Sequence, residues 1–344
     1  MPSFCLKSRP PRGAFLATVA VLGFSAPALA DTDIDFSLDW KFEGPAAPFL
    51  LAEEKGYFDA EGLDVSIDTG AGSVEPINRV ASGVYDMGFG DINSVIKFND
   101  QNPDTPIKSI YIVYNKPPFA IVGRRSLGIS EPGDLEGKTL GAPAPDGAYA
   151  QWPIFVEAND IDADSVTIEN VGFPVREPML AAGDVDAITG FSFSSFINLK
   201  ANNVPVDDIA VLLMADHGVD LYGNTIIVSP AFAEENPEAV KGFLRALNKA
   251  VKETIADPEA AVDYVLDANA ILDKETELER LQMAINQNVV TDEVKENGLG
   301  AIDTDRMDSA IDQIGLTFTF ASKPEPGDVF DPSFLPAEDE RALD

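Results

Sequence analysis

Cysteine and histidine are almost missing from this chain of 344 residues. The single cysteine, Cys5, lies within the first thirty residues, and the single histidine is His217. After residue 30, disulfide frameworks, thiolate metal sites and cysteine nucleophiles are therefore excluded. A Ser-His-Asp triad or a histidine metal site would depend on His217 alone. We therefore expect a protein that is not an enzyme, with no catalytic residue, no metal site and no cofactor.

Basic residues are scarce, because 24 Lys and Arg face 58 Asp and Glu, which gives a formal net charge of −34. A field of this sign repels nucleic acids and anionic lipids, which argues against both as partners. An acidic surface is also typical of proteins from a salty medium, and this simpler interpretation stays open. With 45% hydrophobic residues the chain can still bury a core, and its length predicts two domains.

A hydrophobic run long enough to span a membrane is missing too, since a span needs about 20 apolar residues. The apolar run at 14–22 follows three basic residues and precedes the small-residue motif at 28–30. This order of a basic, an apolar and a small-residue region is typical of a secretory signal peptide. We predict a signal peptide over residues 1–30, a mature chain that starts at Asp31, and a periplasmic location.

After the first thirty residues, strand-like and helix-like segments alternate. IDFSLDW and LDVSIDTG alternate polar and apolar residues, and PAAPFLLAEEKGYFDAEG between them has a helical pattern. This order predicts an α/β fold with parallel strands, in which ligands bind at the carboxyl ends of the strands. A second set of alternating strands and helices lies between two extended segments, near 115–124 and 217–228. Long amphipathic helices follow the second segment. Two lobes joined by two crossings form a clamshell.

Five motifs, in order, resemble a known family: DWKFEGPAAPFLLAEEKGYFDAEGLDV, INRVASGVYDMGFGD, DLEGKTLGAP, REPMLAAGDVDAITGF and FAEENPEAVKGFLRALNKAV. From Ile34 to about Val290 the chain resembles the periplasmic substrate-binding proteins of ABC importers. The group in question handles nitrate, alkanesulfonates, taurine and pyrimidine-type thiamine precursors. The resemblance implies a small-molecule ligand, and a membrane permease with its ATPase as partners.

The resemblance also implies the fold class, a type II periplasmic-binding-protein clamshell with mixed sheets flanked by helices and two hinge crossings. We predict lobe I over 31–122 and 223–322, lobe II over 123–222, and an acidic, proline-rich tail over 323–344. The opening stretch is most similar to the thiamine-precursor branch, in which a histidine often precedes Ala-Pro. Here residues 43–48 occupy that region without a histidine. A related family of thiamine-precursor synthases shares the fold but uses a histidine and a cysteine-rich segment, which the mature chain lacks.

Candidate ligand contacts lie in six loops that follow strands. Each has a structural alternative: Trp40, Tyr149 and Trp152 as core residues, Asp91 as a helix N-cap, and Glu177 as half of a surface ion pair with Arg176. The predicted ligand-binding residues are Trp40, Phe42, Glu43, Ser73, Val74, Glu75, Asp91, Asp146, Tyr149, Trp152, Glu177 and Phe191.

Carboxylates outnumber cations in these loops, which predicts a ligand rich in N–H donors. Aromatic rings beside them would provide a stacking surface. We therefore expect a planar nitrogen heterocycle or an amine, bound by closure of the two lobes of a monomer. A taurine or alkanesulfonate ligand is the alternative, because the helix N-termini at Ser73 and Asp146 could bind an oxyanion. A sensor module that passes the same ligand to a membrane receptor also stays open, as does a periplasmic enzyme, although no nucleophile or cofactor site for one is found in the sequence.

Overall fold

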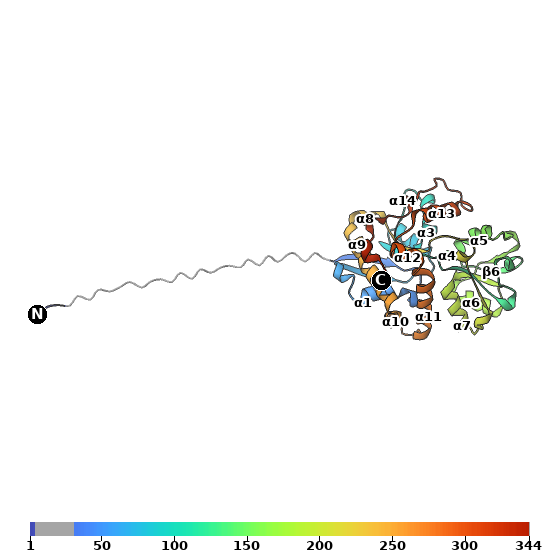
Figure 1. Cartoon of the computed structure of the whole chain (residues 1–344), viewed down its shortest axis with the longest axis horizontal. Coiled ribbons are helices and arrows are strands. Elements are labelled where there is room, and N and C mark those ends of the chain that lie inside the picture. Colours follow the sequence, from blue (N-terminus) through green and yellow to red (C-terminus); the bar gives the residue numbers. More distant parts are fainter. Residues whose placement is uncertain (4–30, 344) are drawn as a thin grey trace. The chain divides into compact units, whose positions relative to one another are not determined.

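The computed structural model describes residues 1–3 and 31–343. The predicted signal peptide includes residues 4–30, which lie outside the described part. From Asp31 onward the chain forms one compact unit, in which two sheets are surrounded by helices (Figure 1). Within the described ranges no helix is long and apolar enough to cross a bilayer.

The first sheet has five strands in the order β2-β1-β3-β10-β4. Strand β1 (Thr32–Ser37) pairs in parallel with β2 (Leu63–Asp68) and β3 (Met87–Asp91). Strand β10 (Asn224–Val228) comes from much later in the chain and lies antiparallel between β3 and β4 (Lys108–Ile112). The sheet is therefore mixed, as predicted, and combines two distant parts of the chain.

The second sheet repeats this arrangement in the order β7-β6-β8-β5-β9. Strand β6 (Thr139–Gly141) pairs in parallel with β7 (Thr167–Glu169) and β8 (Ala187–Phe191). Strand β5 (Phe119–Arg124) lies antiparallel between β8 and β9 (Ile209–Leu213). The lobe boundary that we predicted after residue 122 falls inside β5, because the extended segment near 115–124 contains both a crossing and the start of this strand.

The helices begin where prolines and capping side chains favour a first turn. Three consecutive helices after β10 each begin at a proline, whose fixed φ suits that position. The helix bounds are α1 (Ala47–Glu54), α2 (Glu75–Ala81), α3 (Ile92–Gln101), α4 (Gly147–Ala150), α5 (Trp152–Ala158), α6 (Phe173–Ala182), α7 (Ser192–Ala201), α8 (Pro230–Glu235), α9 (Pro237–Ala256), α10 (Pro258–Ala268), α11 (Lys274–Ala284), a π-helical turn (Ile285–Val289), α12 (Asp292–Asn297), α13 (Thr304–Gly315), α14 (Pro326–Val329) and α15 (Glu338–Arg341).

Aromatic rings join the first sheet to its covering helices. The ring of Phe36 in β1 lies 5.5 Å from that of Phe49 in α1 and 5.0 Å from that of Phe243 in α9, and all three are buried. Burial of each side chain contributes roughly 1.5–3 kcal/mol. A second core joins β5 to α5 and α13. We call the first sheet and its helices the first lobe, and the second sheet with α4 to α7 the second lobe.

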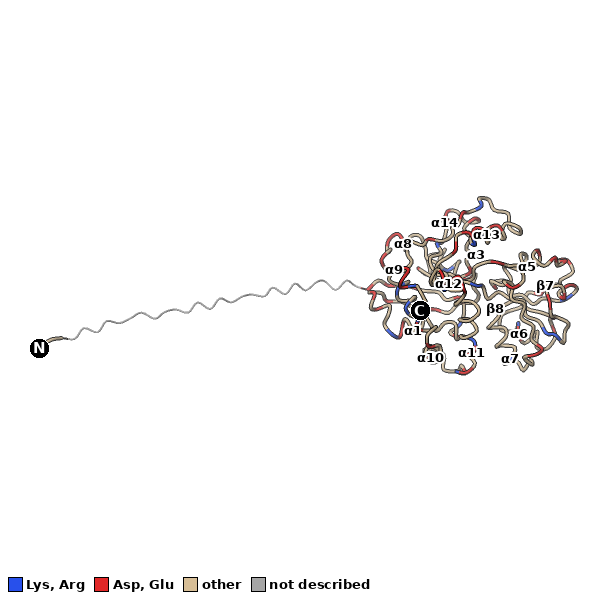
Figure 2. Tube along the Cα trace, viewed as in Figure 1, with Lys and Arg blue, Asp and Glu red and all other residues tan. Residues whose placement is uncertain are grey.

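The acidic, proline-rich tail is ordered in its described part. Phe330 forms a bridge to Ser109 in β4, and Arg341 Nη1 donates to the carbonyls of Asn297 and Leu299 at 3.1 and 3.0 Å. The tail thereby covers an edge strand that would otherwise be open to pairing with other chains. Asp and Glu occur along the whole trace from Asp31 on, so the negative charge is a property of the entire unit (Figure 2).

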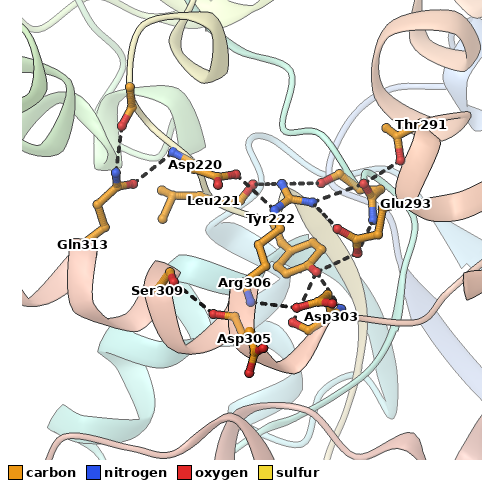
Figure 3. A network of polar contacts seen from close by, with 12 residues as sticks. Asp220, Leu221, Tyr222, Thr291, Glu293, Asp303, Asp305, Arg306, Ser309 and Gln313 are labelled. Atoms are coloured by element: carbon orange, nitrogen blue, oxygen red, sulfur yellow. Dashed lines mark hydrogen bonds and ion pairs between the residues drawn. The ribbon is translucent and has the colours of Figure 1, made fainter. Parts of the chain in front are cut away.

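Residues 113–118 and 214–223 carry the chain between the two sheets, which matches the two predicted crossings. One side chain, Arg306 of α13, binds both of them (Figure 3). Its Nη2 donates to the carbonyls of Asn115 and Leu221, one in each crossing, at 3.1 and 2.7 Å. Its Nη1 donates to Glu293 at 2.9 Å, and the guanidinium lies 4.1 Å from the ring of Tyr222. We call Asn115, Leu221, Tyr222, Glu293 and Arg306 the hinge network.

Candidate functional site

A cavity of about 600 Å³, including its mouth, lies between the two lobes. Its wall is largely apolar with a few charged groups, which is the composition typical of small-molecule sites. The first lobe contributes Leu38, Asp39, Trp40, Lys41, Glu43, Pro45, Ala46, Phe49, Gly72, Ser73, Phe89 and Tyr114, and the second lobe contributes Asp146, Phe173, Arg176, Phe191, Phe193 and Ser194.

The ends of the parallel strands place most of this wall. The segment from Leu38 to Ala46 follows β1, and Ser73 lies in the loop after β2. In the second lobe, Asp146 follows β6, and the first turn of α6 follows β7. This is the position that parallel α/β sheets offer to ligands, because the connections diverge there and leave a crevice.

Trp40 forms one side of the cavity. Its Nε1 donates to Glu43 Oε2 at 3.2 Å, which fixes the plane of the indole. The ring of Phe173, from the second lobe, lies 4.8 Å away at an interplanar angle of 70°. The two rings therefore approach each other across the cleft, where a flat ligand could contact both.

Asp39 lies beside Trp40 and is 8% exposed. Its Oδ2 accepts a hydrogen bond from Asn224 Nδ2 at 2.9 Å. Burial raises the pKa of this carboxyl from 3.8 to about 7, and the neighbouring Glu43 adds to the rise. Near neutral pH the group can therefore be present as a neutral acid, which both donates and accepts a hydrogen bond.

A buried ionic group forms the opposite wall. Arg176 donates from Nε and Nη2 to Glu177 Oε1 at 3.0 and 2.6 Å, and its Nη1 lies 3.6 Å from Asp146 Oδ2. Thr189 donates to the same Asp146 oxygen at 2.7 Å. Burial raises the pKa of Asp146, while the charge of Arg176 opposes that rise. The interpretation of Arg176 and Glu177 as a surface pair is wrong, because both are buried.

Ser73 is a buried hydroxyl in the wall with no hydrogen-bond partner among the described residues. It lies against the second lobe, since a Cβ on Gly147 would lie 2.2 Å from its Oγ. Gly72 beside it has a φ of +105°, and a Cβ there would meet the carbonyl oxygen of Pro145 at 2.4 Å. Glycine is thus needed at both positions for the lobes to approach this closely.

Of the twelve predicted ligand-binding residues, the structure brings five together around the cavity. They are Trp40, Glu43, Ser73, Asp146 and Phe191. Their role in binding remains a prediction, but their convergence from four loops in two lobes is a property of the fold.

Phe42, Val74 and Glu75, three of the first-lobe predictions, lie outside the wall and make other contacts. Phe42 packs against the core of the first lobe. Val74 is the N-cap residue of α2 and is half-buried. Glu75 accepts from the backbone N–H of Ala71 at 2.5 Å and pairs with Arg79 at 2.8 Å.

The remaining four are buried or packed elsewhere. Asp91 caps α3 through Asn93 and Ser94, which is the structural alternative that we considered. Trp152 is 7% exposed in the second core, and Tyr149 packs against the same core. Glu177 lies behind Arg176 and also accepts from Ser195 Oγ at 3.0 Å.

Sequence reasoning missed Asp39, Phe173 and Arg176 as wall residues, together with Tyr114 from the first crossing. Asp39 directly follows the end of a strand pattern, and that position was a usable signal. Phe173 and Arg176 lie three apart in the first turn of α6, so they share a helix face. Tyr114 had no local signal, because its place in the wall depends on the path of the crossing.

The family model described as NMT1/THI5 like matches residues 45–261, which is more than half of the chain. This protein belongs to the NMT1/THI5-like family. The resemblance stated from the five motifs is therefore confirmed at the level of the family.

Among the described residues no group of three or more His, Cys, Asp or Glu side chains is arranged to bind a metal ion.

Relatives of this chain include proteins named as binding proteins and proteins named as synthases. The riboflavin-binding protein RibY of Chloroflexus aurantiacus is 29% identical over 64% of this chain, and the match spans 62% of RibY. The formylaminopyrimidine-binding protein of Halalkalibacterium halodurans is 29% identical over 74% of this chain and 77% of its own length. The 4-amino-5-hydroxymethyl-2-methylpyrimidine phosphate synthase of Aspergillus parasiticus is 28% identical over 70% of this chain and 71% of its own.

Solved structures confirm the fold. The periplasmic aliphatic sulphonate binding protein SsuA of Escherichia coli superposes with a TM-score of 0.69 at 11% identity, covering 89% of this chain and 94% of that chain. At this identity the similarity concerns the fold alone. The fold is that of the periplasmic binding proteins, as the resemblance implied.

Proposed function

We propose that this protein is the exported solute-binding component of an ABC-type importer and that it binds a planar nitrogen heterocycle of the pyrimidine class. The ligand enters between the two lobes, stabilises the closed form by contacting both, and is passed to a membrane permease. Both walls of the cavity come from one chain, which supports a monomer as the functional unit.

The observation that carries this proposal is the pairing of rings with hydrogen-bonding carboxyls. Trp40 and Phe173 meet edge to face from opposite lobes, Glu43 accepts from the indole N–H, and Asp39 lies in the same wall. An aminopyrimidine offers a flat π face together with an edge of N–H donors and ring-nitrogen acceptors. A half-protonated Asp39 can pair with such an edge through two hydrogen bonds, one in each direction.

The sulfonate alternative has less support from the geometry. A sulfonate needs several donors, and the cation of the second-lobe wall, Arg176, already donates from Nε and Nη2 to Glu177. The carboxylates of Glu43 and Asp146 in the wall would repel an oxyanion. Other donors in the wall are the hydroxyl of Ser73, the exposed ammonium of Lys41, and Nη1 of Arg176, which already lies 3.6 Å from Asp146.

We also propose that the bound ligand undergoes no reaction in the cavity. Its wall has no histidine and no cysteine among the described residues, and its lysine, Lys41, is exposed. Because family members include synthases, this part needs its own measurement. Incubation with an aminopyrimidine followed by mass spectrometry should return the compound unchanged.

A thermal-shift screen tests the ligand class. The protein, produced from Asp31 onward, is heated with 4-amino-5-hydroxymethyl-2-methylpyrimidine, riboflavin, taurine or nitrate. We expect the melting temperature to rise with the pyrimidine and to stay constant with taurine and nitrate, because only a ligand that binds the folded state raises it. Riboflavin tests whether the cavity also accepts a larger heterocycle. A rise with taurine alone would reject the heterocycle in favour of the sulfonate.

A further inference from the structure

Arg280 of α11 lies at a contact between the two lobes that is separate from the hinge. Its side chain is 4% exposed, and α11 packs against α7 of the second lobe. Its acceptors belong to both lobes, which is unusual for a buried cation. We call Glu43, Glu277, Arg280, Ser194 and Asn198 the Arg280 bridge.

On the first-lobe side, the guanidinium binds two carboxylates. Nε and Nη2 donate to the two oxygens of Glu277 at 3.0 and 3.3 Å, and Nη1 lies 3.5 Å from Glu43 Oε2. Glu277 also accepts from the backbone N–H of Gly44 at 2.7 Å. A Cβ on Gly44 would lie 2.3 Å from the carbonyl oxygen of Glu277, so the loop after β1 and α11 are in direct backbone contact.

On the second-lobe side, the same guanidinium binds α7. Nη2 donates to Asn198 Oδ1 at 3.2 Å, and Nη1 donates to the carbonyl oxygen of Ser194 at 3.5 Å. Ser194 lies in the cavity wall, one turn before Asn198 on the helix. The bridge therefore has one end at each wall of the cavity.

The oxygen of Glu43 that faces Arg280 is also the one that accepts from Trp40 Nε1. Any change in the position of the guanidinium therefore changes the group that orients the indole. If α7 moves away with the second lobe, Arg280 loses two hydrogen-bond acceptors. Its guanidinium is then left with Glu43 and Glu277 as its only partners in the bridge. The N–H groups of a guanidinium point in fixed directions. A buried arginine must therefore rotate to form hydrogen bonds with a new set of acceptors.

We propose that Arg280 is a positioning residue that couples the orientation of Trp40 and Glu43 to closure of the two lobes. The inference rests on the proposed function, since it concerns the same cavity, but it is tested without any ligand. Closure places Asn198 and Ser194 against Arg280, Arg280 fixes Glu43, and Glu43 fixes Trp40. A ligand that contacts Trp40 and Glu43 then favours closure even where it does not touch α7.

The test uses Trp40 as its own reporter. The sequence has two tryptophans, so a Trp152→Phe background leaves Trp40 as the single emitter. Its accessibility is measured as the Stern–Volmer constant for acrylamide, a neutral quencher that the negative charge of the protein does not repel. The variants are Asn198→Ala, which removes an acceptor without leaving a buried charge, and Arg280→Lys. The matched control is Lys200→Ala, because Lys200 pairs with Glu279 between the same two helices but touches no bridge residue.

We expect the quenching constant of Trp40 to rise about twofold in Asn198→Ala and Arg280→Lys and to stay constant in Lys200→Ala. In a Glu43→Gln background, Asn198→Ala should cause no further rise, because the uncharged amide no longer forms the ion pair with Arg280 that transmits the effect. Equal constants in Asn198→Ala and the parent would overturn the proposal, and so would a rise in Asn198→Ala that persists in full in the Glu43→Gln background. A ligand of another class would contradict the proposed function but leave these results unchanged.

Discussion

The indole N–H of Trp40 donates to Glu43 at 3.2 Å, while the indole ring lies 4.8 Å from Phe173 of the other lobe. One side chain thus connects a carboxyl of its own lobe to an aromatic ring of the opposite lobe. A flat ligand that enters at this point contacts both lobes at once, which is the requirement for ligand-driven closure.

Replacing Trp40 removes the largest ring of the wall. We expect Trp40→Ala to weaken binding of the heterocycle about 10- to 100-fold, because a stacked ring contributes roughly 1–3 kcal/mol. Isothermal titration calorimetry measures the change in Kd. Trp152→Phe is the control, since Trp152 stacks on Phe155 in the second core and lies outside the wall. Full affinity in Trp40→Ala would contradict the stacking role.

The raised pKa of Asp39 predicts a pH-dependent stability. The folded carboxyl titrates at about 7 against an ordinary value of 3.8, so between these values the folded state binds a proton that the unfolded state has lost. The contribution of Asp39 to the free energy of unfolding is therefore fully present below about pH 4. It decreases as pH rises towards about 7, by up to about 1.4 kcal/mol per unit.

The difference between parent and Asp39→Asn isolates this effect from other titrating groups. Urea unfolding from pH 4 to 8 should show that the parent loses stability relative to Asp39→Asn as pH rises. Asp64→Asn, at an exposed position in β2, should follow the parent at every pH. A constant difference between parent and Asp39→Asn over the whole range would show that Asp39 has the same pKa in the folded and unfolded states.

Gly72 allows the lobes to close. Gly72→Ala combines a strained φ of +105° with a Cβ that would lie 2.4 Å from Pro145 of the second lobe. Gly83→Ala is the matched control, because Gly83 has a φ of +70° but nothing within 4 Å of its added Cβ. Both variants should lose about 1 kcal/mol of stability from backbone strain. Only Gly72→Ala should lose ligand affinity, by at least about tenfold. Equal affinities of the two variants in calorimetry would show that the lobes do not need to approach each other at Gly72 for binding.

Replacement of Arg306, which connects the residues of the hinge network, should cause a large loss of stability. Arg306→Gln leaves Glu293 without its cation and removes hydrogen bonds to both crossings, so we expect the free energy of unfolding to fall by about 3 kcal/mol. Lys295→Gln, which removes an exposed pair with Asp292, should leave it unchanged within error. Equal midpoints of urea unfolding in the two variants would show that the hinge network does not stabilise the fold.

The alternation of strands and helices, with the five motifs, was enough to predict the fold class. Hydrophobic periodicity is a local property, so it can be recognised in the sequence without knowing the tertiary contacts. The site was harder to predict. Asp91 and Asp146 each follow a strand and cap a helix, yet Asp146 lies in the cavity wall and Asp91 does not. Sequence position cannot separate these cases, because the direction of the side chain depends on the partner lobe. Arg176 was missed as a wall residue for the same reason, since its ion-pair partner Asp146 comes from another segment of the chain.

The most direct test of the proposed function is a calorimetric titration of the protein, produced from Asp31 onward, with 4-amino-5-hydroxymethyl-2-methylpyrimidine at pH 7, beside a titration with taurine. We predict one site per chain with a Kd of about 1 μM or tighter for the pyrimidine, which corresponds to about 8 kcal/mol, and no heat of binding for taurine. Binding of taurine with no heat from the pyrimidine would contradict the assignment of the cavity to a nitrogen heterocycle.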